Sequence, residues 1–276
     1  MKYCFLRFPD FKIKALTLSY DDGVSYDKKL IEIMSKYRLK CTFNICSGLF
    51  PKEEGGRCLS EKEAFSLYSA SGHEVAVHGE KHLPLAAIDS ASVFNEIFSD
   101  RKNLEKLFDR AVHGMAYAYG SYSDTVVEIA RLCGIHYART VDTREDFSIP
   151  TDWLRMPATC HHREPRLMEL AKKFLEEPEG GFWKKRPKLF YLWGHSYEFE
   201  DRNEWHIIEE FAKLVGNRED VWYATNGEIY EYVQAYDRLQ FNADRTRVYN
   251  PSILDVYICY FGKNYLIPSG VTVQLV

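Results

Sequence analysis

The sequence predicts an α/β fold built on parallel strands, because strand-like and helix-like segments alternate along most of its 276 residues. The strand-like segments are short apolar runs, and the helical segments repeat apolar residues every three or four positions. About seven such strand–helix units precede residue 241. A steady β-then-α order places crossover helices between parallel strands, which gives either an open doubly wound sheet or a barrel.

The predicted elements follow one another in regular order. Strand-like segments lie at 15–19, 40–45, 73–78, 114–120, 135–140, 188–195 and 221–225. Helical segments lie at 28–37, 60–72, 90–108, 123–134, 165–176, 204–215 and 227–239. A loop-rich stretch separates the fifth strand from the fifth helix, and residues 176–187 are expected to form a surface loop.

Local signals support individual elements. The first helical segment places Leu30 and Met34 on one face, and the strand-like segment after it alternates apolar with polar residues. The second helix begins with a capping box, in which Ser60 and Glu63 satisfy each other's backbone groups, and it ends at Gly72.

After residue 241 the periodicity changes to that of β-hairpins, with a turn expected near Gly262 and Lys263. About 35 residues rarely hold a hydrophobic core alone. We therefore expect residues 1–241 to form the α/β domain and residues 242–276 to form a small β appendage packed on it.

Composition excludes several classes of protein. Hydrophobic residues make up 46% of the chain, enough for a substantial core, and the net charge of −4 argues against a nucleic-acid partner. No apolar run reaches the roughly 20 residues of a membrane-spanning helix. The seven cysteines are scattered without a C-x-x-C pair, which favours free thiols. With no visible signal peptide, these features predict a cytoplasmic protein; an exported form with a trimmed signal is the alternative.

Polar side chains gather where the predicted strands end. The first strand runs into Asp21 and Asp22, the third into His78 and His82, and the 188–195 strand ends at His195. Adjacent Asp residues before a glycine are common in turns. However, parallel sheets collect binding groups at the carboxyl ends of their strands, so the whole set is better explained by a functional site.

The segment "HGEKH" differs from the zinc-protease helix H-E-x-x-H, because Gly79 follows its first histidine and its flanks predict a loop. Two imidazoles with one carboxylate nevertheless form a suitable set of ligands for one divalent metal. We expect zinc, with cobalt, nickel or manganese as alternatives.

Three motifs together resemble the polysaccharide deacetylase family, also described as the NodB homology domain or carbohydrate esterase family 4. They are "LTLSYDDG", "GHEVAVHGEKH" and "AYAYG", and the later "LFYLWGH" is similar to that family's final motif. The likeness spans roughly residues 13–235. It implies a distorted (β/α) barrel that removes N-acetyl, or O-acetyl, groups from an acetylated carbohydrate by metal-dependent hydrolysis.

The resemblance also implies a role for each matching residue. Asp21 corresponds to the catalytic base and His195 to the general acid. The backbone N–H of Tyr119 corresponds to the oxyanion donor. The metal ligands implied by the resemblance are Asp22, His78 and His82.

Two positions depart from the family pattern. Many members carry an Arg that orients the base where this chain has Ala116, and Arg139 and Arg155 are candidates to replace it. The carboxylate that tunes the catalytic histidine is also open, with three candidates in the loop-rich stretch: Asp142, Asp146 and Asp152.

Other polar and aromatic residues carry weaker expectations. Trp193, Tyr197 and Arg155 are candidate substrate-binding residues, although the two aromatics are equally plausible in the core. The pair His161–His162 is either ordinary or lines the pocket. The acidic run at 198–204 is expected to be a solvated entrance to a helix.

The leading interpretation is thus a metal-dependent carbohydrate deacetylase. The alternatives are a related hydrolase of small non-peptide amides and a catalytically silent sugar-binding module on the same scaffold. Intact acids and histidines at the strand ends argue against the silent module.

Overall fold

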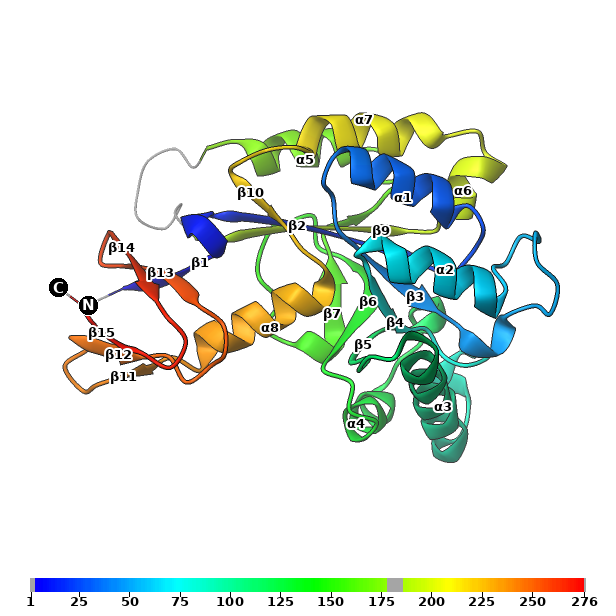
Figure 1. The fold of residues 1–276 in the computed structure, drawn as a ribbon, viewed down its shortest axis with the longest axis horizontal. Coiled ribbons are helices and arrows are strands. Elements are labelled where there is room, and N and C mark those ends of the chain that lie inside the picture. The colour runs from blue at the N-terminus through cyan, green and yellow to red at the C-terminus, as the bar shows by residue number, and fades with distance from the viewer. Residues whose placement is uncertain (1–2, 178–185, 276) are drawn as a thin grey trace.

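The structure, a computed structural model, describes residues 3–177 and 186–275 (Figure 1). Its main feature is a nine-stranded sheet in which eight strands follow the order β7-β6-β5-β4-β3-β2-β9-β8, all parallel, while β10 pairs with β2. The strands are β2 (Lys14–Asp21), β3 (Cys41–Ile45), β4 (Glu74–Val77), β5 (Gly114–Ala116), β6 (Tyr137–Thr143), β7 (Met156–Ala158), β8 (Cys160–His161), β9 (Lys188–Gly194) and β10 (Val221–Tyr223).

This sheet curls until it nearly closes. Strands β7 and β8 stand at opposite ends of the strand order, yet only Thr159 separates them in the chain. The N–H of Thr159 donates to the carbonyl of Tyr191 on β9 at 2.9 Å. The sheet is therefore a distorted (β/α) barrel, which confirms the fold class expected from the sequence. The loop-rich stretch contributes the two short closing strands, which the sequence analysis did not anticipate.

Helices cover the outside of the barrel (Figure 1). The α-helices are α1 (Asp27–Lys36), α2 (Glu61–Ser71), α3 (Ser90–Phe108), α4 (Asp124–Leu132), α5 (Leu167–Leu175), α6 (Ser196–Asp201), α7 (Trp205–Val215) and α8 (Asn226–Asp237). Short 3₁₀ turns are η1 (Pro9–Phe11), η2 (Ser47–Leu49), η3 (Leu85–Ala87), η4 (Ala118–Gly120) and η5 (Trp153–Arg155). None of the helices in the described ranges combines the length and apolar character needed to span a bilayer.

The local signals have the expected structural counterparts. Ser60 caps α2 by accepting from the N–H of Glu63, and the Glu63 side chain accepts from the N–H of Ser60. Gly72 ends the helix in the left-handed region at φ +67°. The predicted surface loop at 176–187 lies mostly outside the described residues.

The amino end of the barrel is filled by the start of α8. Asn226 donates its side-chain N–H to the hydroxyl of Tyr191 and accepts from the hydroxyl of Thr17. Beside it, Glu74 accepts from the backbone N–H of Gly227 at 2.9 Å. A helix N-terminus carries unpaired N–H groups, and Glu74 satisfies that of Gly227 inside the barrel.

Two small antiparallel sheets make up the rest of the fold. One has the order β1-β13-β14 and the other β11-β12-β15. Their bounds are β1 (Cys4–Arg7), β11 (Gln240–Phe241), β12 (Arg247–Tyr249), β13 (Val256–Tyr260), β14 (Lys263–Ile267) and β15 (Thr272–Gln274). The hairpin turn at Phe261–Gly262 has positive φ at both residues, as a tight two-residue turn requires. Strand β1 therefore pairs with β13, so residues near the start of the sequence share a sheet with residues after position 255.

Candidate active site

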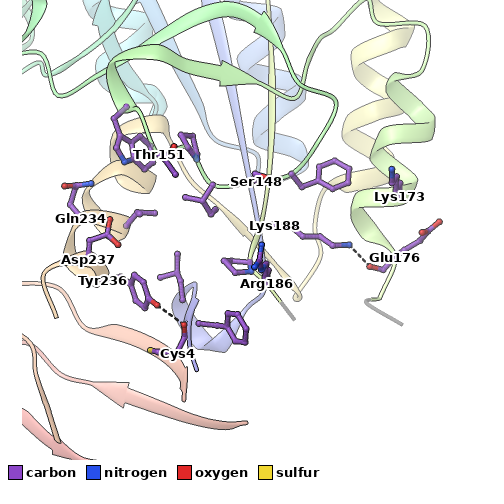
Figure 2. Close-up of a pocket in the computed structure, with 18 of the residues that line it drawn as sticks. Cys4, Ser148, Thr151, Lys173, Glu176, Arg186, Lys188, Gln234, Tyr236 and Asp237 are labelled. Carbon is purple, nitrogen blue, oxygen red and sulfur yellow. Dashed lines mark hydrogen bonds between the residues drawn. The ribbon is translucent and has the colours of Figure 1, made fainter. Parts of the chain in front are cut away.

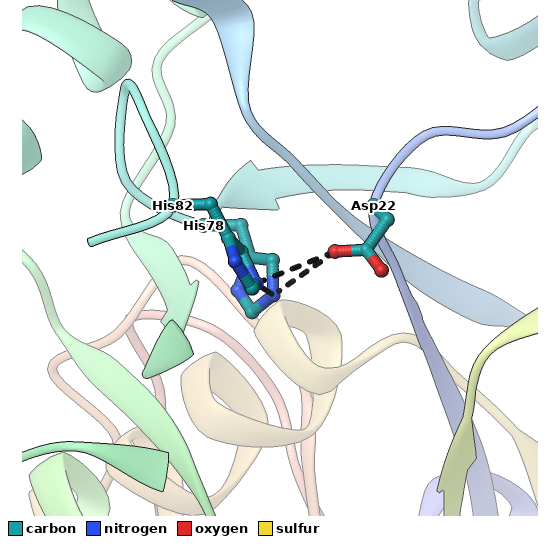
Figure 3. Close-up of side chains that lie close together, drawn as sticks. All are labelled: Asp22, His78 and His82. Atoms are coloured by element: carbon teal, nitrogen blue, oxygen red, sulfur yellow. Dashed lines mark hydrogen bonds and ion pairs between the residues drawn. The ribbon is translucent and has the colours of Figure 1, made fainter. Parts of the chain in front are cut away.

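Three predicted metal ligands meet at the carboxyl end of the barrel strands (Figure 3). Asp22 follows β2, His78 follows β4, and His82 lies one short loop later. The Asp22 Oδ1 atom is 3.5 Å from the Nε2 atoms of both histidines, and the two Nε2 atoms are 3.2 Å apart. A tetrahedral zinc ion with bonds of about 2.0–2.1 Å holds its ligand atoms roughly 3.3 Å apart, so these residues fit a divalent metal.

The tautomer of His78 also suits a ligand. Its Nδ1 atom lies 2.9 Å from the carbonyl oxygen of Ala116, where only a protonated nitrogen makes a hydrogen bond. The Nε2 atom then keeps its lone pair, pointing toward Asp22 and His82. Such a backbone acceptor behind a metal-binding histidine fixes both the ring orientation and the tautomer.

Three residues around this cluster have a strained backbone conformation. Asp22, His82 and Tyr119 have φ values of +81°, +57° and +58°, in the left-handed region that non-glycine residues seldom adopt. Each such residue costs of order 1–3 kcal/mol and persists only where the surrounding structure imposes it. The three strained residues come from separate loops at one end of the barrel.

Asp21, the predicted base, points into a fully buried ion pair with Arg139. Arg139 lies on β6 and is the register partner of Ala116 on β5. The guanidinium missing at position 116 is therefore supplied from the neighbouring strand, which decides between the two sequence candidates. Arg155 instead pairs with Asp124 and Asp152.

The surroundings of Asp21 keep it ionised. Burial alone would raise the pKa of this carboxyl, but Arg139, then His78 and His195, and a hydrogen bond from Asn44 together lower it to about 2. The Asn44 side-chain nitrogen donates to Asp21 Oδ1 at 2.8 Å. A carboxylate held in this way is available to accept a proton near neutral pH.

His195, the predicted acid, faces Asp21 from the end of β9. Its Nε2 atom is 3.8 Å from Asp21 Oδ2, and its Nδ1 atom is 3.2 Å from Glu198 Oε2. Burial would lower the pKa of His195, but the hydrogen bond to Glu198 and the negative charges of Asp21 and Asp22 raise it above its usual value. His195 is therefore suited to carry a proton.

Glu198 is the residue that sequence reasoning missed. It lies in the acidic run that was expected to be solvated, and for Glu198 that expectation was wrong, because it faces three histidines. His161 Nε2 is 3.2 Å from the same Oε2 atom, and His162 Nε2 is 3.4 Å from it. The signal was its place three residues after His195, one helical turn along α6.

The group formed by His161, His195 and Glu198 also has metal-like spacing. The Nδ1 atom of His161, however, accepts from the backbone N–H of Arg163 at 3.2 Å. A neutral His161 then carries its proton on Nε2 and donates it to Glu198. This arrangement favours a proton-bearing network over a second metal centre.

The carboxylates proposed from sequence to tune His195 lie elsewhere. Asp142 accepts from the hydroxyl of Tyr122, Asp146 accepts from the backbone N–H of Ser148, and Asp152 binds Arg155. None of them has a described contact with His195, and Glu198 occupies that position.

The predicted substrate-binding residues divide into two groups. Trp193 packs over the Arg139 guanidinium at 4.2 Å, and the ring of Tyr197 lies 5.1 Å from that of His195. Both therefore line the site. Arg155 is held by its two aspartates and does not reach Asp21. Tyr119 adds an aromatic ring that is 69% exposed and lies edge-on to His82.

A large cavity of about 1410 Å³ lies away from this cluster (Figure 2). It is bounded by Cys4, Lys188 and Tyr236, near the amino end of β9 and the far end of α8. None of the residues that line it belongs to the predicted catalytic or metal-binding set.

Comparison with known proteins adds independent evidence. Residues 9–138 match the sequence model of the family described as polysaccharide deacetylase. This match includes Asp21, Asp22, His78, His82 and Tyr119, while His195 lies beyond it. No curated protein sequence matches the chain.

Solved structures with TM-scores above 0.5 share the fold at low identity. A candidate polysaccharide deacetylase from Mycobacterium smegmatis is 16% identical, with a TM-score of 0.60 over 84% of this chain and 94% of that one. A mutant of BA3943, a carbohydrate esterase family 4 pseudoenzyme with restored activity, is 15% identical, with a TM-score of 0.51 over 82% and 70%. The deacetylase PplD from Streptococcus pyogenes is 21% identical, with a TM-score of 0.46 over 50% of this chain; the match spans only 61% of PplD.

Proposed function

We propose that this protein is a metal-dependent hydrolase that removes acetyl groups from a carbohydrate, because residues 9–138 match the sequence model of the polysaccharide deacetylase family. An N-acetylated sugar is the preferred substrate, and an O-acetylated one is the alternative. Zinc is the expected ion. One observation supports the proposal: three side chains that could bind a metal, Asp22, His78 and His82, have ligand atoms 3.2–3.5 Å apart, next to the Asp21 carboxylate that Arg139 keeps ionised.

The ligand set supports the metal. Asp22 offers an oxygen, and His78 and His82 offer nitrogens at separations of 3.2–3.5 Å. Three protein ligands leave further coordination positions for water and substrate, as catalytic zinc sites do. A bound divalent ion would supply Lewis-acid activation of water and of the acyl carbonyl.

The chain's own residues supply the proton transfers. Asp21, kept ionised by Arg139, would accept the proton of the attacking water. His195 would donate a proton from Nε2 to the departing nitrogen or oxygen, while Glu198 holds its Nδ1–H. Such acid–base help typically contributes ~10²–10⁴-fold in rate. The N–H of Tyr119 is proposed as the donor to the developing oxyanion.

Two observations bear on the alternative functions. The ion pair with Arg139 keeps Asp21 ionised without any metal, and Glu198 positions His195. A sugar-binding module that performs no chemistry has no need of a base and an acid with opposite pKa shifts. A hydrolase of small amides would use the same residues, so the substrate panel below decides between these two enzymes.

The test measures acetate release from N-acetylated oligosaccharides, acetylated xylan and small acetamides. The wild type is assayed as purified, after chelation, and after zinc is restored. We expect release from a carbohydrate that chelation abolishes and zinc restores. His195→Asn should keep the metal content but lower kcat, and less so on an acetyl ester with a good leaving group. Release from acetamides alone, or release unaffected by chelation, would contradict the proposal.

A further inference from the structure

We propose that two buried carboxylates of α3, Asp100 and Glu96, are positioning residues for the metal site. They act through the backbone of the loop 78–82, which carries two of the three ligands. This inference rests on the proposed metal site but is independent of the substrate. Neither residue touches the predicted ligand atoms.

Asp100 joins two loops at the carboxyl end of the barrel. Its side chain is fully buried, and its Oδ2 accepts from the N–H of His78 at 2.9 Å. Its Oδ1 accepts from the N–H of Ser47, in the loop after β3, at 2.7 Å. The start of the ligand loop is thereby tied both to α3 and to the neighbouring strand end.

Glu96 holds the middle of the same loop from one helical turn away. Its side chain is 4% exposed, and its Oε2 accepts from the N–H of Lys81 at 2.9 Å. Its backbone carbonyl accepts from the N–H of Glu80 at 3.0 Å. At Gly79, where φ is +86°, a Cβ atom would lie 3.3 Å from Glu96 Oε2, so the loop lies close against the helix.

Two acids on one buried helix face are a poor choice for stability alone. Residues four apart on a helix are neighbours, and like charges there repel. An apolar face would pack α3 onto the barrel at no such cost. What the acids add is a fixed path for the loop backbone.

That path determines where the imidazoles lie. His82 has a left-handed φ of +57°, and its Nε2 is brought to 3.2 Å from that of His78. Before a metal binds, a proton on His82 Nε2 can hold the two rings together by donating to His78 Nε2. Metal binding replaces that proton, so we assign to the backbone contacts with α3 the role of keeping both nitrogens aimed at one point when the ion enters.

The test is a zinc titration of the metal-stripped full-length protein against a competing chelator. Removing a residue that orients metal ligands from behind typically weakens metal affinity by about 10–100-fold. We expect Asp100→Asn to show a loss in this range, because its amide turns a donor toward a backbone N–H. Glu96→Gln, which keeps an oxygen for Lys81, should lose less, and Glu96→Ala should lose more than Glu96→Gln.

The matched control is Glu74→Gln at the other end of the barrel. Glu74 also accepts from a backbone N–H, that of Gly227, but does not contact the ligand loop. It should lower the free energy of unfolding and leave the zinc Kd unchanged.

The outcomes separate the two proposals. Zinc affinity in Asp100→Asn equal to that of wild type would overturn the positioning role while leaving the proposed function standing. If that variant does not fold, equal affinity in Glu96→Ala and wild type decides against the role. A wild type that binds no zinc overturns both.

Discussion

At the carboxyl end of the barrel, Asp22 faces two imidazole nitrogens across gaps of 3.5 Å and keeps a side chain 26% exposed. At the amino end, Glu74 accepts hydrogen bonds from Thr42, Tyr137 and Gly227 at 2.7–2.9 Å. Both carboxylates project from the same sheet. Asp22 faces imidazole nitrogens that could bind a metal together with it, whereas Glu74 is surrounded by hydrogen-bond donors.

This difference separates polar groups that do chemistry from those that hold the fold. A carboxylate whose oxygens already accept hydrogen bonds is not in need of a metal ion or a substrate as a further partner. A carboxylate that faces imidazole nitrogens on a strained backbone is suited to bind a further group, such as a metal ion. We therefore regard the polar groups at the amino end as part of the structural framework and propose the carboxyl end as the binding site.

The strongest test of this contrast removes the ligand itself. Asp22→Ala should abolish zinc binding and acetate release, because two imidazoles alone make an incomplete site. Elemental analysis of the purified protein measures the first effect. Asp142→Ala, an acid of the nearby surface, serves as the control and should keep its metal. Wild-type zinc content in Asp22→Ala would show that the ligands are other residues.

The buried ion pair between Asp21 and Arg139, at the carboxyl end of the barrel, should matter for stability as well as for chemistry. Arg139→Met leaves Asp21 without its cation, which typically costs about 3–5 kcal/mol in the free energy of unfolding. It should also raise the pKa of Asp21, moving the acidic limb of the rate profile to higher pH. Urea unfolding of Arg139→Met and Arg155→Met makes the comparison, because the exposed pair of Arg155 is expected to contribute at most about 1 kcal/mol. If both variants lost a similar free energy of unfolding, the buried pair of Arg139 would contribute no more to stability than the exposed pair of Arg155.

Glu198 should set the alkaline limb of the rate profile. Its hydrogen bond helps raise the pKa of His195, so Glu198→Gln should lower that pKa and shift the fall in activity to lower pH. The metal content should stay at the wild-type level. Glu200→Gln is the control, since Glu200 instead accepts from the indole of Trp205. If the pH–rate profile of Glu198→Gln matched that of the wild type, Glu198 would have no role in tuning the pKa of His195.

The smallest effect is expected for a substitution of Glu74, at the amino end of the barrel. Glu74→Gln should cost about 1–3 kcal/mol, the typical penalty for disturbing buried hydrogen bonds. Burial raises the pKa of Glu74, so its contribution is greatest at low pH and declines as pH rises through the folded-state value. The stability gap between wild type and variant should therefore narrow with rising pH. A gap that widens would mean that the carboxylate is held by charge, as Asp21 is.

Much of this arrangement follows from the sequence because it depends on local rules. The capping box of α2, the limits of α3 and the clustering of polar residues at strand ends all rest on neighbouring residues. The convergence of Asp22, His78 and His82 follows from the parallel order of the strands. Their roles as ligands remain predictions.

What the sequence analysis missed or left open depends on register and on distant pairing. Arg139 replaces the missing Arg because β5 and β6 align it with Ala116, and register is not written in either segment alone. Strands β7 and β8 span three and two residues, too short to show a periodicity. Glu198 was hidden in an acidic run that resembles a solvated surface.

The pairing of β1 with β13 has a consequence for how the chain folds. Cys4 lies opposite Tyr260, so the first strand cannot be paired until nearly the whole chain is available (Figure 1). Contacts between residues so far apart in the chain are slow to form, and unpaired strand edges are exposed to aggregation in the meantime. During synthesis, β1 is thus expected to stay unpaired while the barrel strands assemble, until residues 256–260 emerge and pair with it.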